Sequence, residues 1–285
     1  MKIYFEVDHK SNAINRVVTN LAKYLPSNFA RVKSKSEADM VILHISGRNN
    51  HKTREARNLT GQGKQYAVIQ YSWKSTRNPD PNDWMELWQG AKVVWSYYAL
   101  PLPDYYHAPL AADSSIFYPQ EEEKKYLVGS VGNSFKVECI GELQFAVWYA
   151  KKYGVHVGKN FNSNPIIDYV SSIDDSEMRA MYNKCKWFSC LRRKEGFEMP
   201  AVEALLCGVR PIMFDTPNYR QWFDGLAEFI PERSVADTVN RLNKLLKTEP
   251  RPVTKEEIEE TKRRFNWEVV IARFYDRLIN SNSSP

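Results

Sequence analysis

The sequence predicts an α/β protein built from two doubly wound parallel sheets, and three observations carry this prediction. Short apolar runs of strand length alternate with segments of helical periodicity along the chain. The charged stretch Glu121–Lys125 interrupts this alternation and is typical of an exposed link between domains. The stretch Trp187–Phe214 has the pattern strand, helix, strand, the repeating unit of a parallel sheet. A length of 285 residues fits two domains of ordinary size.

The composition describes a chain that can bury large cores, since 43% of its residues are hydrophobic. The N-terminus becomes charged after one short strand, and no apolar run approaches the length that spans a bilayer. We therefore expect a cytoplasmic protein that is soluble or peripheral at a membrane surface. The four cysteines lack metal-ligand spacing and are expected to be reduced core thiols. They are Cys139, Cys185, Cys190 and Cys207.

Positive charge is concentrated in the first half of the chain. The net charge is +6, and +5 of it falls on Met1–Tyr118. Within this part, Arg31–Lys64 holds eight basic and three acidic residues. One interpretation is an ordinary solvated basic face, and the other is a surface for a phosphate-bearing acceptor or a membrane.

The first half alternates between strands and helices in the order expected of a parallel sheet. It has no GxGxxG turn, and the chain has no GxxxxGK[ST] loop, which removes the main support for dehydrogenase and nucleotide triphosphatase functions. Ser11 or Asn12 could cap the first helix, and Pro26 ends it. The predicted strands are 2–7, 38–46, 66–72 and 92–98, and the predicted helices are 14–25, 53–59 and 84–91.

The second half continues the same alternation from Tyr126 onward. The segment 215–225 is expected to be a crossing loop. The predicted strands are 126–133, 155–160, 187–191 and 209–214, and the predicted helices are 137–153, 174–185, 200–207, one within 229–247, and 265–278.

The helix that follows Trp187–Leu191 opens just past the carboxyl end of a strand. Pro200 falls where a helix takes its first residue, and Gly208 stands at the expected left-handed stop. In a doubly wound sheet such an opening favours anionic ligands, because free amides and the helix dipole both attract negative charge. Glu195 and Glu203 flank the opening and could face one ligand, although two solvated acids at a helix start would have the same spacing.

The residues around this opening resemble the glutamate, seven residues, glutamate signature of retaining glycosyltransferases of the GT-B fold, family 4 (glycosyl transferases group 1). The family pattern is roughly EGFGxPxxEAxxxG, and Glu198 stands here in place of its second loop glycine. The segment His107–Pro119 is similar to the family's inter-domain segment. The matching residues are Glu195, Gly196, Phe197, Met199, Pro200, Glu203, Ala204 and Gly208.

The resemblance implies a GT-B fold, in which two Rossmann-like, doubly wound parallel-sheet domains face each other across a cleft. On this pattern, residues 1–118 are the acceptor domain and residues 119–265 are the nucleotide-sugar donor domain. Residues 266–285 are then a C-terminal helix that crosses back to the N-terminal domain.

The resemblance also implies roles for individual residues. Glu195 would orient the transferred sugar, and Lys136 would bind the donor's diphosphate. The family usually has an arginine after the glycine matched by Gly132, and its absence here leaves Arg192, Arg193 or Lys194 as substitutes. Glu203 would accept hydrogen bonds from the ribose hydroxyls. The full donor-binding set is Gly132, Asn133, Arg192, Gly196, Phe197, Glu198, Met199, Pro200 and Glu203.

Two histidines of the first domain are candidates for the acceptor side. His44 ends a strand and follows Asp39 and the apolar residues Met40–Leu43, and its family counterparts follow an aspartate and two or three apolar residues. The resemblance implies that His44 would be the catalytic group of that domain. His9 follows the first strand, and its loop, with Ser11 and Asn12, should border the acceptor. The sequence contains no Asp-x-Asp metal motif after an apolar strand, so we expect neither a metal nor a cofactor.

The sequence therefore predicts a retaining, metal-independent hexosyltransferase that uses a nucleotide diphosphate sugar. Mannose or glucose is favoured, with GDP-mannose ahead of UDP-glucose, and the acceptor is a glycan, protein-linked or lipid-linked. The alternatives are a DNA-modifying sugar transferase of the same fold and a nucleotide-sugar-binding protein without turnover. Nucleic acid is not an obligate partner. Contact of the basic first domain with a membrane surface, and a homodimer, both stay open.

Overall fold

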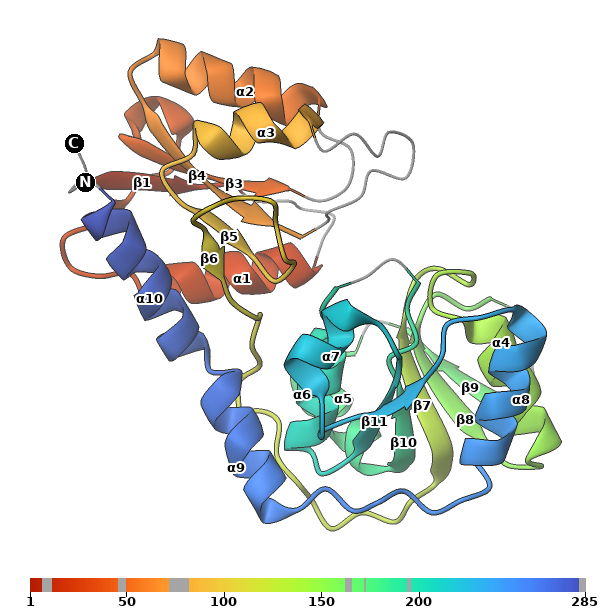
Figure 1. The fold of residues 1–285 in the computed structure, drawn as a ribbon. Coiled ribbons are helices and arrows are strands. Elements are labelled where there is room, and N and C mark those ends of the chain that lie inside the picture. Colours follow the sequence, from red (N-terminus) through yellow and green to blue (C-terminus); the bar gives the residue numbers. More distant parts are fainter. Residues whose placement is uncertain are drawn as a thin grey trace. The chain divides into compact units, whose positions relative to one another are not determined.

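The computed structural model describes residues 1–6, 12–45, 50–71, 82–161, 166–171, 173–193 and 196–281. The chain divides into two compact units (Figure 1), one of Met1–Leu110 with Trp267–Pro285 and the other of Ala111–Asn266. Each unit contains a six-stranded sheet among the described residues, and the strand pairings in both sheets are parallel. The predicted α/β class with two parallel sheets is confirmed.

The first sheet has the strand order β2-β1-β3-β4-β5-β6. Its strands are β1 Lys2–Phe5, β2 Ala30–Arg31, β3 Met40–Ile45, β4 Gln65–Gln70, β5 Val94–Ser96 and β6 Tyr106–His107. The helices of this unit are α1 Asn12–Lys23, α2 Asn50–Gly61, α3 Asn82–Gln89 and α10 Trp267–Asn280, with a 3-10 turn at Lys35–Glu37.

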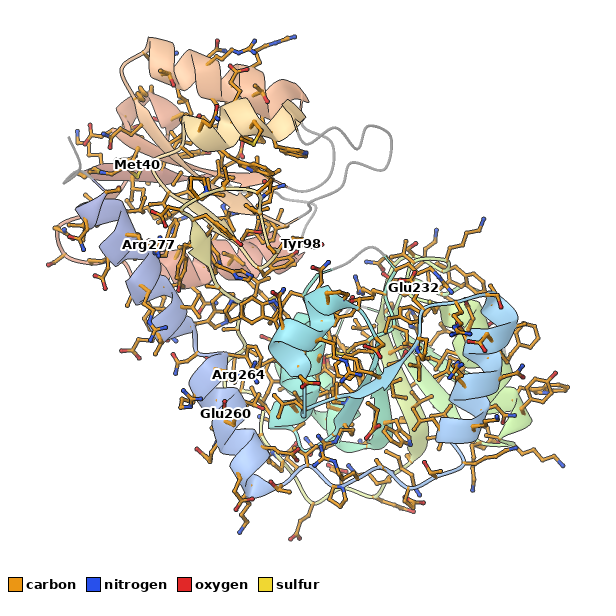
Figure 2. All side chains as sticks on the ribbon, viewed as in Figure 1. Met40, Tyr98, Glu232, Glu260, Arg264 and Arg277 are labelled. Carbon is orange, nitrogen blue, oxygen red and sulfur yellow. The ribbon has the colours of Figure 1, made fainter. Side chains whose placement is uncertain are left out.

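Helices α1 and α10 lie on one face of the first sheet, and α2 and α3 lie on the other (Figure 1). Two buried tyrosines fix α10 in this unit. The hydroxyl of Tyr275 donates a hydrogen bond to the Leu21 carbonyl at 2.8 Å, and that of Tyr106 donates to the Val270 carbonyl at 2.7 Å. Arg277, labelled in Figure 2, adds an ion pair with Asp104 on the surface. The last helix of the chain is therefore part of the first unit's core.

The second sheet has the strand order β12-β11-β10-β7-β8-β9. Its strands are β7 Tyr126–Gly132, β8 Gly154–Gly158, β9 Ile167–Val170, β10 Cys185–Ser189, β11 Arg210–Phe214 and β12 Glu228–Ile230. The helices of this unit are α4 Ile140–Tyr149, α5 Asp175–Asn183, α6 Met199–Leu206, α7 Pro217–Phe223, α8 Val235–Leu245 and α9 Lys255–Arg264.

The order of the strands places the helices of the second unit in two layers. Helices α4 and α8 cover one face of the sheet, and α5, α6 and α7 cover the other (Figure 1). Right-handed crossovers account for α4 on one face and α5, α6 and α7 on the other. Helix α4 connects β7 to β8, whereas α5, α6 and α7 connect strands in the opposite direction along the sheet, from β9 to β12. The carboxyl ends of β7, β10 and β11 therefore meet at one edge, where ligands of such sheets bind.

Three helical segments of the second unit differ from the sequence-based expectation, and the short strands β9 and β12 were not expected. The expected crossing loop at 215–225 contains the helix α7, which begins after Thr216, whose hydroxyl accepts a hydrogen bond from the Tyr219 amide. The helix expected at 137–153 begins only at Ile140, because Cys139 has a left-handed backbone with φ of 52°. Helix α9 was not expected at all.

A buried arginine ties the end of the second unit to its sheet. Arg210 lies in β11 with a fully buried side chain, and its guanidinium donates to both carboxylate oxygens of Glu257 on α9, at 3.1 and 2.8 Å. It also donates to the carbonyl oxygens of Leu226, Arg251 and Pro252. Because the charge is both paired and hydrogen-bonded, its burial is tolerated.

Candidate functional site

The candidate site lies at the carboxyl edge of the second sheet, where β7 ends at Gly132. The backbone of Gly132 has φ of 147°, which favours glycine. A Cβ atom built on Gly132 would overlap the carboxyl group of Glu138. A glycine is therefore required here for two reasons, the backbone angle and the carboxylate packed against its α-carbon.

The turn after β7 folds the Glu138 side chain back over the strand end. The Ser134 amide donates a hydrogen bond to the Glu138 carboxylate, and the Glu138 amide donates to the Ser134 carbonyl at 3.1 Å. The left-handed Cys139 then starts α4 in a new direction. As a result, the Glu138 carboxylate is buried beside Gly132, and only 8% of its side chain is exposed.

Arg192, in the loop after β10, joins this turn to the start of α6. Its guanidinium donates to the Val131 carbonyl at 3.2 Å and forms ion pairs with Glu138 at 3.5 Å and Glu198 at 3.3 Å. Glu198 also accepts a hydrogen bond from the Tyr219 hydroxyl at 3.3 Å. The Arg192 side chain is 23% exposed and that of Glu198 only 4%, so the cation is the member of the cluster that solvent reaches most easily.

His156 fixes the strand end from the opposite side. Its Nε2 lies 3.0 Å from the Gly132 carbonyl oxygen, and its Nδ1 lies 2.9 Å from the Ser130 hydroxyl. Burial lowers the pKa of His156, and the nearby charge of Arg192 lowers it further against the effect of the Gly132 carbonyl. A neutral imidazole must donate from Nε2 to the carbonyl and accept at Nδ1 from Ser130. His156 therefore holds Gly132 in place as a neutral group.

Helix α6 contributes its N-terminus and one buried carboxylate to this edge. Pro200 is its second residue, one position later than expected, and Gly208 has the predicted left-handed backbone with φ of 74°. Glu203 is buried and accepts a hydrogen bond from the Tyr182 hydroxyl at 2.7 Å. Burial and this carboxylate raise the pKa of Tyr182 well above its usual value, so Tyr182 remains the donor.

Arg193 points away from the cluster around Arg192. It pairs with Glu142 on α4 at 2.9 Å and with Glu232, labelled in Figure 2, at 3.7 Å. Its guanidinium also donates to the carbonyl of Lys136 at 3.5 Å. Of the two described arginines that the sequence offered as substitutes, Arg192 is therefore the one that lies against the end of β7.

The remaining candidates of the second unit lie around the same edge. Lys136 and Asn133 are exposed in the turn after β7, and the Asn133 side chain accepts a hydrogen bond from the Lys159 amide at 3.1 Å. Gly196 and Phe197 lead into α6, Met199 is its first residue, and all three are buried. Glu195 and Lys194 lie outside the described residues.

In the first unit, His44 is buried within β3. Its Nδ1 lies 2.9 Å from the hydroxyl of Tyr71, and the two rings stack with centroids 5.7 Å apart. Burial raises the pKa of Tyr71 well above its usual value, so the hydroxyl stays protonated. His9 and Ser11 lie outside the described residues, and Asn12 is the first residue of α1.

The described ranges also bear on a metal centre, a membrane-spanning helix and reactive thiols. No group of three or more His, Cys, Asp or Glu side chains there could hold a metal ion. No helix there combines the length and the apolar character needed to cross a bilayer. The four cysteines are free and buried, and burial raises their pKa values.

The chain is similar to one protein-family model and to several solved structures. Residues 159–264 match the family model described as Glycosyl transferases group 1, a stretch that includes Arg192, Glu198 and Glu203. HepE from Anabaena, solved in complex with UDP, is similar over 98% of this chain and 100% of that one, with a TM-score of 0.73 and 11% identity. The chain has the GT-B fold. None of the curated protein sequences matches it.

Two further structures share the GT-B fold along nearly their whole length. Sucrose-phosphate synthase from Thermosynechococcus elongatus has a TM-score of 0.72 and 12% identity, with 98% of this chain and 99% of that one covered. The lipopolysaccharide outer core galactosyltransferase WaaB, in its apo form, has a TM-score of 0.65 and 14% identity, with 99% and 100% covered. At these identities the likeness shows the fold alone, and the predicted fold class is confirmed.

Three residues of this edge were missed by sequence reasoning. Glu138 sits in a short apolar run, and only the left-handed Cys139 reveals that its side chain turns back. His156 lies inside a predicted strand, and Tyr219 lies in the segment expected to be a loop. No spacing pattern in the sequence links these three side chains, since they lie in the turn before α4, in β8 and in α7.

Proposed function

We propose that the protein is a retaining glycosyltransferase that moves a hexose from a nucleotide diphosphate sugar to a glycan, protein-linked or lipid-linked acceptor. The observation that carries the proposal is the position of Arg192, a partly exposed guanidinium held between Gly132 and the start of α6. The family match that includes Arg192, and the GT-B fold, support the same function. GDP-mannose is the donor we favour, followed by UDP-glucose.

The proposed chemistry follows from charge. When the bond between sugar and diphosphate breaks, the leaving diphosphate gains negative charge, and groups that bind it more tightly at that moment lower the barrier. Arg192 supplies a guanidinium that can form two parallel hydrogen bonds to phosphate oxygens. The N-terminus of α6 adds amide donors and the positive end of a helix dipole. Lys136, exposed in the neighbouring turn, is proposed as a second cation.

The remaining roles concern the donor's sugars and the acceptor. Glu203, buried on α6 beside Tyr182, is proposed to accept hydrogen bonds from the ribose hydroxyls. Glu195 is proposed to orient the transferred hexose. In this scheme the departing phosphate itself takes the proton of the acceptor hydroxyl, on the same face of the sugar, so that the anomeric configuration is retained. The scheme requires no metal ion, and His44 is proposed to act on the acceptor side.

The proposal is tested by incubating the protein with GDP-mannose, UDP-glucose and ADP-glucose without an acceptor. We expect slow release of a nucleoside diphosphate, fastest from the true donor, because water replaces the acceptor at a low rate. Proton NMR should show that the sugar first released has the donor's anomeric configuration. Tight binding without release of any product would instead indicate a nucleotide-sugar-binding protein, and the absence of binding would contradict the proposal.

A change of Glu195 to Gln tests the proposed orienting role. Loss of one charge-assisted hydrogen bond to the sugar should lower kcat of donor hydrolysis about tenfold. The affinity for the free nucleoside diphosphate should not change, because that ligand lacks the hexose. Hydrolysis at the wild-type rate would remove Glu195 from the scheme.

A further inference from the structure

The Glu138 carboxylate occupies the place that the proposed function gives to a phosphate. A ligand diphosphate held by Arg192 at the end of β7 would lie next to Gly132, whose lack of a side chain gives access to the backbone. In the structure, the space over the Gly132 α-carbon is filled by the Glu138 carboxyl group. The Ser134 amide could donate a hydrogen bond to an anionic ligand in this turn, but it donates to the Glu138 carboxylate instead.

The Glu138 carboxylate also forms an ion pair with Arg192, the cation that is proposed to bind the diphosphate. Arg192 is paired with Glu138 at 3.5 Å and with Glu198 at 3.3 Å. The two carboxylates are almost fully buried, with 8% and 4% of their side chains exposed, so water screens them little. These two ion pairs place two negative charges around one positive charge, and an approaching diphosphate adds more negative charge to the cluster.

The contacts of the two carboxylates differ, and they identify Glu138 as the one that can leave the cluster more easily. Glu198 is the residue before α6, and the Tyr219 hydroxyl holds its Oε1 at 3.3 Å from the side of α7. Glu138 is held by Arg192 and by the amide of Ser134 within its own turn. Its release therefore requires movement of one side chain and one short turn, and leaves the α6 side of the cluster unchanged.

We propose that Glu138 competes with the donor's diphosphate for Arg192. The Glu138 carboxylate holds Arg192 while the site is empty and sets how tightly phosphate is bound. This inference rests on the proposed function. It assigns Glu138 as a specificity-determining residue that favours release of the charged nucleoside diphosphate product. The neutral parts of the donor, its base and sugars, then contribute a larger share of the binding free energy.

The inference is tested with Glu138→Gln, because Gln keeps the shape and can still accept the hydrogen bond from the Ser134 amide while it removes the charge. Calorimetry should show that GDP and UDP bind about tenfold more tightly to this variant than to the wild type. Guanosine and uridine, which lack phosphate, should bind both proteins equally. The matched control is Glu142→Gln, which removes an equally buried carboxylate that pairs with Arg193 instead. It should leave all four affinities unchanged.

A second variant separates competition for Arg192 from a general effect on the turn. In the background of Arg192→Gln, the Glu138→Gln change should no longer tighten GDP or UDP binding, since the two effects pass through the same cation. Unchanged or weaker diphosphate binding by the single Glu138→Gln variant would overturn the inference and leave the proposed function intact. An equal change for nucleosides and diphosphates would also overturn it. Failure of the wild type and the variant to bind any nucleotide would overturn the proposed function itself.

Discussion

Replacing Arg192 with Gln is expected to weaken the binding of GDP and UDP about 100-fold, since truncating one partner of a hydrogen-bonded charge pair in a partly buried site costs several kcal/mol. The guanidinium donates to the carbonyl of Val131, the residue before Gly132, and it faces solvent more than the two carboxylates that it bridges. Calorimetry with each nucleoside diphosphate and the corresponding nucleoside measures the effect. Binding of the nucleoside should change little, because it presents no phosphate.

The matched control for this variant is Arg193→Gln. Arg193 is the next residue, its side chain has the same 23% exposure, and it also pairs with a buried glutamate, but it points toward Glu142 and Glu232. If both variants lose diphosphate affinity equally, the loss reflects the general charge of the loop and not a specific site. If only the Arg193 variant loses affinity, the assignment of Arg192 is wrong.

Replacing Glu257 with Gln is expected to lower the free energy of unfolding of the second unit by about 3 kcal/mol, because it leaves the buried Arg210 charge without its partner. Gln still accepts the hydrogen bond that the Thr254 amide donates to Glu257 at 2.8 Å, so the start of α9 is kept. Urea titration measures the loss. The control is Glu259→Gln on the same helix, whose 70% exposed side chain pairs with Lys262 and should contribute a few tenths of a kcal/mol.

The same ion pair predicts how stability depends on pH. Burial alone would raise the pKa of Glu257, but hydrogen bonds from Arg210 and the Thr254 amide outweigh burial and lower the pKa to about 2. In the unfolded chain a glutamate titrates near pH 4.3, about the ordinary value. The carboxylate therefore stabilises the fold above that pH, and this contribution is lost as the pH falls toward 2. Unfolding of the Glu257→Gln variant should depend less on pH in this window, and an identical pH dependence would contradict the assignment.

The sequence was sufficient for the fold class, because apolar runs mark the longer buried parallel strands without reference to their neighbours. The short strands β2, β6, β9 and β12 were not predicted. The strands ending at Gly132 and Ser189, and the helix stop at Gly208, were all predicted. Helix α9 was missed because it is almost wholly polar, although Thr254 and Glu257 form a capping box that the sequence spells out. Helix α7 was missed because the segment 215–225 was expected to be a crossing loop, although Thr216 followed by Pro217 is typical of a helix start.

The candidate site was predicted only where one contiguous segment carries it. The loop from Arg192 to Pro200 stood out from the sequence, since its residues are neighbours along the chain. The pairing of Arg192 with Glu138 could not be predicted, because it joins two loops that follow different strands and depends on the left-handed backbone at Cys139. The roles of Glu195, Lys136, His44 and the acceptor-side residues stay predictions.

A crystal structure of the protein with bound GDP or UDP tests the central claim most directly. The account predicts that the diphosphate lies at the carboxyl edge of the second sheet, with phosphate oxygens about 3 Å from the Arg192 guanidinium and facing the start of α6. The Glu138 carboxylate should then have left its position over Gly132. A diphosphate bound elsewhere, with Arg192 still paired to both Glu138 and Glu198, would contradict the account.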